Sequence, residues 1–189
     1  MNIEQIIDSI YPLSKPAKDK LTAVFTEISF SKNYILSEYE KHENYFYFIK
    51  NGLVRAYALQ EDRELTFWFG KDGDPALSMY NYILNRPSYE TIDLIEDSTF
   101  YYTKISQLEQ LYSTDIEIAN WGRKFAEIEL LKTEERSILR QIKSAKERYL
   151  DLLERDAYLL NRVPLKYISS FLGVTQVSLS RIRSEFLKK

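Results

Sequence analysis

Cysteine is absent from this chain of 189 residues. The absence excludes disulfides, thiolate zinc sites, iron–sulfur clusters and a cysteine nucleophile. Histidine occurs once, at His42, which is too few for a metal site built from several histidines. No Ser-His-Asp or Cys-His arrangement has a basis in such a sequence. We therefore expect no enzyme activity, no metal and no other cofactor.

Long hydrophobic runs are also missing, since none approaches the roughly 18 residues of a membrane span. The first residues, Met1–Gln5, lack the basic start and apolar core of a signal peptide. The chain is 44% hydrophobic, 29% charged and 14% aromatic, which is typical of a globular protein. The sequence predicts a soluble, cytoplasmic protein with no membrane partner.

Charge is distributed unevenly along the chain. Residues 141–189 hold ten basic and five acidic side chains, a net charge of +5. The other residues hold 16 basic and 23 acidic side chains, a net charge of −7. A basic end on an acidic body indicates an anionic partner at that end. The alternative is an ordinary solvated helical surface.

The first 26 residues predict two helices. Isoleucines at Ile3, Ile6, Ile7 and Ile10 recur at helical spacing. Pro12 ends this segment, and a second helix can begin near residue 16, with an apolar face at residues 21, 24 and 25.

Residues 28–106 are rich in aromatic and β-branched side chains, in short runs separated by turn residues. This texture predicts an antiparallel roll or barrel. Asn51-Gly52, between two apolar runs, predicts a hairpin turn, and residues 78–84 predict a short helical insert. The expected strands are Tyr34–Leu36, Tyr45–Ile49, Leu53–Leu59, Leu65–Phe69, Thr91–Ile95 and Thr99–Thr103.

Residues 115–146 predict one long charged helix with an apolar seam. Lys132 and Glu135 interrupt the seam, whose pattern is otherwise that of a coiled coil. We expect a parallel homodimer joined along this seam, and the alternative is a single helix packed on its own β-domain. The seam residues are Trp121, Phe125, Ile128, Leu139 and Ile142.

Residues 163–183 predict a helix-turn-helix. Pro164 can open the first helix, Gly173 suits the end of that helix, and Thr175 can cap the second helix. Two short helices joined at a glycine are typical of DNA-binding proteins, although an ordinary pair of packed helices is the alternative. The residues expected to contact DNA are Lys166, Thr175, Gln176, Val177, Ser178, Ser180, Arg181 and Arg183.

The whole chain resembles the Crp/Fnr family of bacterial regulators. Phe46–Arg55 looks like a core hairpin of that family, Lys71–Asp74 like its Gly-Asp turn and Leu165–Arg183 like its reading head. The resemblance implies an α+β protein with an N-terminal antiparallel β-roll (jelly-roll-like) flanked by helices. A long central dimerisation helix and a C-terminal helix-turn-helix domain follow. The implied boundaries are 1–114, 115–143 and 144–189.

The family's cyclic-nucleotide cassette is incomplete in this chain. Its Gly-Glu pair falls on Leu77 and Ser78, and its Arg-Ser pair falls on Glu90 and Thr91. A carboxylate at a phosphate clamp is repulsive, so we expect an effector other than cyclic AMP, unless the alignment slips and brings in Arg86. The weak candidate pocket is Leu77, Ser78, Met79, Glu90 and Thr91.

In the family, three positions at the start of the second helix contact bases. Here they are Gln176, Val177 and Arg181, which suit adenine, a thymine methyl group and guanine respectively. A phosphate contact or an ion pair to Glu185 is the alternative for Arg181. The family's terminal β-hairpin wing is not expected after the second helix.

The expected partners are double-stranded DNA, a second copy of the chain, a small-molecule effector of unknown identity and RNA polymerase. The competing hypothesis is a ligand-binding or protein-interaction module with a vestigial helix-turn-helix.

Overall fold

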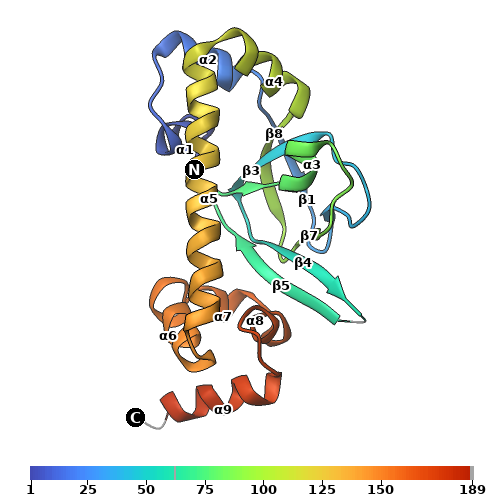
Figure 1. Ribbon diagram of the computed structural model, residues 1–189, viewed down its shortest axis with the longest axis vertical. Helices are drawn as coiled ribbons and strands as arrows, with labels where there is room; N and C mark the ends of the chain where they lie inside the picture. Colours follow the sequence, from blue (N-terminus) through green and yellow to red (C-terminus); the bar gives the residue numbers. More distant parts are fainter. Residues whose placement is uncertain (62, 188–189) are drawn as a thin grey trace. The chain divides into compact units, whose positions relative to one another are not determined.

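The computed structural model describes residues 1–61 and 63–187, and Figure 1 shows their helices and strands. Asp62 and two basic residues of the C-terminal segment, Lys188 and Lys189, lie outside the described residues. The chain divides into two compact units. Unit 1 contains residues 1–56 and 69–131, and unit 2 contains residues 57–68 and 132–189. The three domain boundaries expected from the sequence stay a prediction.

Two short helices begin the chain, as the sequence predicts. Helix α1 spans Ile3–Ile10, and its start is fixed by a capping box in which Asn2 and Gln5 bond each other's backbone. Helix α2 spans Lys15–Ala23 and has a proline in its first turn. The apolar face of α1 buries Ile6 and Ile7.

Within the described residues, eight strands form two four-stranded sheets, with the orders β1-β8-β3-β6 and β2-β7-β4-β5. All six expected strands are present, with β1 and β6 in addition. The antiparallel pairs β1–β8 and β3–β8 make up most of the first sheet. The strands are β1 Thr26–Phe30, β2 Ile35–Ser37, β3 Tyr45–Asn51, β4 Val54–Gln60, β5 Arg63–Gly70, β6 Pro75–Ala76, β7 Thr91–Leu94 and β8 Ser98–Lys104.

Gly52 is not a hairpin turn, so that prediction is wrong. Strands β3 and β4 on its two sides belong to different sheets, and Gly52 is the corner between them. Its φ angle of +139° disfavours side chains, and a Cβ atom there would lie 2.2 Å from Oγ of Ser98. The Gly52 N–H donates to Asp72 (3.0 Å). Glycine is needed here because the backbone of one sheet passes close to the other.

The next helices are α3, within the roll, and α4, α5 and α6 after it. Helix α3, Met79–Leu84, is the expected insert and is capped by Ser78. Helix α4 spans Ile105–Thr114, and the long helix α5 spans Ile116–Ile142. Ser144 then caps α6, Ala145–Arg155, through a capping box with Glu147.

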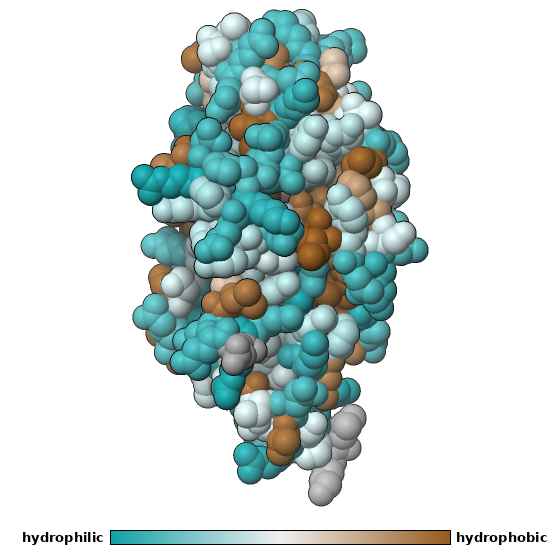
Figure 2. All heavy atoms as spheres, turned by 90° about the vertical axis from the view of Figure 1, so that its right-hand side faces the viewer, coloured by the Kyte–Doolittle hydropathy of each residue, from teal (hydrophilic) through white to brown (hydrophobic). Residues whose placement is uncertain are grey.

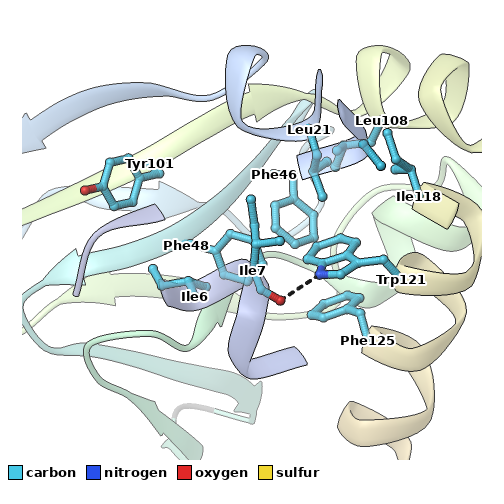
Figure 3. Close-up of a cluster of buried hydrophobic side chains, with 11 residues drawn as sticks. Ile6, Ile7, Leu21, Phe46, Phe48, Tyr101, Leu108, Ile118, Trp121 and Phe125 are labelled. Carbon is cyan, nitrogen blue, oxygen red and sulfur yellow. Dashed lines mark hydrogen bonds between the residues drawn. The ribbon is translucent and has the colours of Figure 1, made fainter. Parts of the chain in front are cut away.

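The core of unit 1 is aromatic. Figure 3 shows Phe46 and Phe48 of β3 facing Trp121 and Phe125 of α5. Trp121 and Phe125 stack with ring centroids 6.0 Å apart, and Nε1 of Trp121 donates to the carbonyl of Ile7 (3.0 Å). A buried indole N–H needs such a partner. The first half of α5 is therefore fixed against its own β-roll.

The predicted dimer seam is wrong at its first two positions. Trp121 and Phe125 are buried in unit 1, so they are not available to a second chain. Ile128 and Leu139 are partly buried, whereas Ile142 is 70% exposed. The large exposed apolar side chains of α5 are Ile116, Leu130, Leu131, Ile138 and Ile142. In the first half of α5, the apolar residues at the predicted seam positions pack into the core of unit 1. A different set of apolar side chains on α5 is exposed.

Candidate nucleic-acid interface and effector site

The helix-turn-helix of unit 2 consists of α8, Leu165–Phe171, and α9, Gln176–Leu187. Gly173 between them has a left-handed φ of +67°. The N–H groups of Gly173 and Val174 donate to the carbonyls of Ser170 and Ser169, both at 3.0 Å. These two bonds form a Schellman motif, which ends α8 and reverses the chain.

Thr175 caps α9, as the sequence predicts. Its Oγ1 accepts the backbone N–H of Ser178 (3.1 Å), and the two hydroxyls are 3.0 Å apart. The hydroxyls of Thr175 and Ser178 thus bond each other at the start of the helix. Ser178 is half-buried and does not lie on the outer face of α9.

The outer face of α9 carries all three residues expected to read bases. Leu179 is fully buried and fixes which side of α9 faces α8. At 100° per residue, one continuous exposed stripe runs from the flank beside Leu179, at Gln176, across the opposite side of the helix, and we call it the α9 face. Sequence reasoning missed one of its members, Ser184, which lies one turn beyond Ser180. The α9 face comprises Gln176, Val177, Ser180, Arg181 and Ser184.

Arg181 forms no ion pair with any other described residue. Glu185, the alternative partner expected from the sequence, instead pairs with Lys146 of α6 at 2.9 Å. The hydrogen bond from Lys146 lowers the pKa of Glu185, and the charge of Arg181 lowers it further. The Glu185 carboxylate is thus paired with Lys146 and not with Arg181. Arg181 is exposed on the α9 face.

The two other basic candidates lie off the α9 face. Lys166 of α8 is exposed, and its ammonium lies 4.7 Å from the ring centre of Tyr167. Arg183 is half-buried on the flank of α9. Such positions suit backbone phosphates rather than base edges.

Arg148 of α6 makes hydrogen bonds to the end of α8 and to the residue that follows α5. Its guanidinium donates to the carbonyl of Leu172 at the end of α8 (2.8 Å) and to the carbonyl of Lys143 just after α5. Lys143 in turn pairs with Asp151 of α6 at 2.6 Å. A single arginine therefore satisfies carbonyl groups at the ends of two helices. Helix α7, Leu159–Arg162, completes the described part of unit 2.

A contact that the sequence did not predict joins α8 to strand β5. Oγ of Ser170 accepts the N–H of Thr66 (2.9 Å) and donates to the carbonyl of Glu64 (2.8 Å). Strand β5 lies at the edge of its sheet, where backbone groups lack a neighbouring strand. One serine hydroxyl thus satisfies two backbone groups of the edge strand.

Of the candidate pocket residues in unit 1, the structure brings Ser78 and Glu90 together. Both are buried, Glu90 to 4% exposure, and the Ser78 hydroxyl bonds the Glu90 carboxylate. Burial raises the pKa of Glu90, and the Ser78 hydrogen bond partly opposes that rise. Oε2 of Glu90 is buried with no hydrogen-bond partner in the described part of the chain.

The other pocket residues have separate structural roles. Leu77 packs on the aromatic core, and Oγ1 of Thr91 accepts the N–H of Tyr39 (3.1 Å). Met79 is partly buried in the first turn of α3. Arg86, which an alignment slip would bring in, is exposed and bonds the hydroxyl of Tyr80 (3.3 Å). No cationic phosphate clamp stands beside Glu90 among these residues.

A buried ion pair in the roll also escaped the sequence reasoning. Arg55 of β4 is 1% exposed and binds Asp93 of β7 through two parallel bonds of 2.9 and 2.6 Å. An arginine inside an apolar strand was the available signal. This guanidinium is engaged by a carboxylate of the neighbouring strand, so it is held away from anions.

Within residues 1–61 and 63–187 no group of three or more His, Cys, Asp or Glu side chains could hold a metal ion. His42 instead contacts the amide of Asn81 (3.3 Å). No described helix is long and apolar enough to span a membrane. Figure 2 shows apolar side chains interspersed with polar ones on the face that it presents.

No family model matches the chain, and no curated protein matches its sequence. Solved structures do match. FixK2 from Bradyrhizobium japonicum is 27% identical with a TM-score of 0.73, and the match covers 87% of this chain and 85% of that one. A mutant of CooA from Carboxydothermus hydrogenoformans is 23% identical with a TM-score of 0.65, covering 100% and 85%.

A third similar structure carries a family name. It is a putative transcriptional regulator of the Crp/Fnr family from Eubacterium rectale, 16% identical with a TM-score of 0.73, covering 93% of this chain and 84% of that one. The fold and the α8–α9 geometry define a protein with a β-roll and a helix-turn-helix. This chain is a structural relative of the Crp/Fnr transcription regulators. The expected α+β fold is confirmed.

Proposed function

We propose that this chain is a homodimeric transcription regulator that binds double-stranded DNA through α8 and α9. The observation that carries the proposal is the α9 face, which is exposed and is polar apart from Val177. It begins at the N-terminus of α9, which Thr175 caps. The second helix of such a motif lies in the major groove with its first residues against base edges. A regulator of this kind works in the cytoplasm, where the bacterial chromosome lies.

The charges of unit 2 support DNA as the partner. Arg181 projects from the α9 face without an ion pair among the described residues, and Lys166 is exposed on α8. A guanidinium can pair with guanine through two hydrogen bonds, and an ammonium neutralises a phosphate. The segment 141–189 has a net charge of +5, which favours approach to a polyanion.

The proposed dimer uses a revised seam on α5. Leu131, Ile138 and Ile142 are exposed, and their spacings of seven and four residues place them on one side of a helix. Exposed apolar side chains at such spacing favour a second helix as their partner. This seam replaces Trp121 and Phe125, while Ile142 is kept from the original prediction.

The proposed effector is a small molecule other than cyclic AMP. Glu90 is buried where the family would place a phosphate clamp, and the carboxyl of Asp93 engages Arg55. A phosphate group would therefore meet the carboxyl group of Glu90, and the guanidinium of Arg55 is already bound to Asp93. Calorimetry with cyclic AMP is expected to show no binding in the micromolar range. RNA polymerase stays a predicted partner.

Salt-dependent binding to duplex DNA tests the proposal. The full chain is titrated against labelled random-sequence duplexes from 50 to 300 mM salt. We expect the logarithm of the binding constant to fall linearly with the logarithm of salt concentration, by about 0.9 per neutralised phosphate.

Two variants of equal charge make this test specific. The double variant Lys166→Ala/Arg181→Ala should bind more weakly and with a smaller salt slope. The double variant Lys15→Ala/Lys32→Ala, altered at exposed positions of unit 1, should bind like the native protein. Absence of DNA binding even at 50 mM salt, or equal weakening by both variants, would sink the proposal.

A further inference from the structure

Val177 is the most exposed of the large apolar side chains on the described surface, with 79% exposure. It lies in the first turn of α9, next to Gln176 and one turn before Arg181. The other members of the α9 face are polar or charged. An isopropyl group in such surroundings has no hydrogen bond to make and no neighbour in unit 2 that covers it.

The packing of α9 does not require an apolar residue at this position. Leu179 is fully buried against α8, and it lies on the other side of the helix from Val177. Thr175 and Ser178 already cap the helix start without help from the Val177 side chain. Valine is also a weaker helix former than alanine, arginine or glutamine, so helix stability gives no reason for it.

The floor of the major groove offers one apolar group that varies with sequence, which is the C5-methyl group of thymine. Every other distinguishing group on the base edges is a hydrogen-bond donor or acceptor. A side chain without polar atoms gains free energy only against that methyl group. It leaves donors and acceptors of other bases without a partner, which disfavours them.

We infer that Val177 is a specificity-determining residue that selects thymine in each half-site through contact with its methyl group. The inference rests on the proposed DNA-binding function. Val177 and Arg181 are four residues apart on one face of α9, so they reach neighbouring base pairs. The half-site should therefore contain a thymine close to the guanine that Arg181 reads.

Deoxyuridine is the direct probe, because it differs from thymidine only by the missing methyl group. An operator is first selected from random duplex DNA with the full chain. Each thymine of one half-site is then replaced singly by deoxyuridine, and Kd is measured for every duplex. One replacement should weaken native binding by about fourfold, the value of one buried methyl group.

Two variants assign the effect to Val177. Val177→Ser removes both methyl groups and should bind the thymine and deoxyuridine duplexes equally well. Val177→Thr keeps one methyl group and should retain most of the difference. Circular dichroism of both variants reports whether α9 is still folded, and the native protein alone supplies the comparison if either variant unfolds.

Other results would overturn either the inference about Val177 or the proposed DNA binding. A selected operator without thymine in its half-sites, or native binding that is indifferent to every deoxyuridine, overturns the inference and leaves the DNA-binding proposal standing. Loss of the methyl effect in Val177→Thr as well as Val177→Ser also counts against it. If the native chain binds no duplex at low salt, the proposed function fails and the inference fails with it.

Discussion

The side-chain hydroxyl of Ser170 makes hydrogen bonds to the backbone beside Thr66 that a neighbouring strand would otherwise make. It accepts the Thr66 N–H at 2.9 Å and donates to the neighbouring Glu64 carbonyl at 2.8 Å. Both backbone groups belong to the edge strand β5, and Ser170 belongs to the first helix of the helix-turn-helix. Residues 57–68 group with the helix-turn-helix in unit 2, and contacts such as this one join them to it.

Replacing Ser170 by alanine should leave two backbone groups of β5 without a protein partner. We expect the free energy of unfolding to fall by about 1 kcal/mol, since water can reach part of this site. The amide of Thr66 should lose protection in hydrogen exchange, measured by NMR. Ser184→Ala is the matched control, because among the described residues its hydroxyl donates to the Arg181 carbonyl within α9 and to no other element. Unchanged protection of Thr66 in Ser170→Ala would contradict the role of this contact.

Replacing Arg181 by alanine should weaken binding to the selected operator by about 1–3 kcal/mol and relax selectivity at one base pair per half-site. The reason is the loss of a guanidinium that forms no ion pair within the described chain. Lys166→Ala should instead weaken binding evenly across sequences and reduce the salt slope by about 1. Competition assays with singly substituted operators measure both effects. If Arg181→Ala weakens binding equally on all operator sequences, Arg181 contacts a phosphate and does not read a base.

The double variant Leu131→Glu/Ile138→Glu should be monomeric, because it places two charges on the exposed apolar side of α5. Sedimentation equilibrium at micromolar concentration measures the change. Ile83→Glu, at a similarly exposed apolar position of α3, should leave the dimer intact. A native protein that is monomeric under these conditions would show that the revised seam is wrong.

Replacing Glu90 by glutamine should change how stability depends on pH. Burial raises the pKa of Glu90, so the folded protein binds this proton more tightly than the unfolded chain. The resulting stabilisation is complete below the unfolded value of 4.5 and is lost as pH rises through the folded pKa. The native protein should therefore lose stability from pH 4.5 upward relative to Glu90→Gln. Urea unfolding across this range gives both curves, and curves that run parallel would refute the assignment.

The helix-turn-helix was predictable because its signals are local. Pro164, Gly173 and Thr175 each act on their own turn of backbone, so their roles survive whatever the rest of the chain does. The Schellman bonds at Gly173 and the Thr175 cap appear where the sequence places them. The strands of the roll were likewise readable from runs of β-branched and aromatic residues.

The sequence by itself thus determined six of the eight described strands, the helix-turn-helix and most of the polar stripe of α9. The tertiary structure alone decided which apolar surface each element buries. Trp121 and Phe125 fit a coiled-coil ladder and a core face equally well, because both need the same helical spacing. Gly52 suits a hairpin or a corner between sheets, and only strand pairing over long sequence distances chooses between them. The Ser170–Thr66 contact spans 104 residues of chain, so no local pattern encodes it.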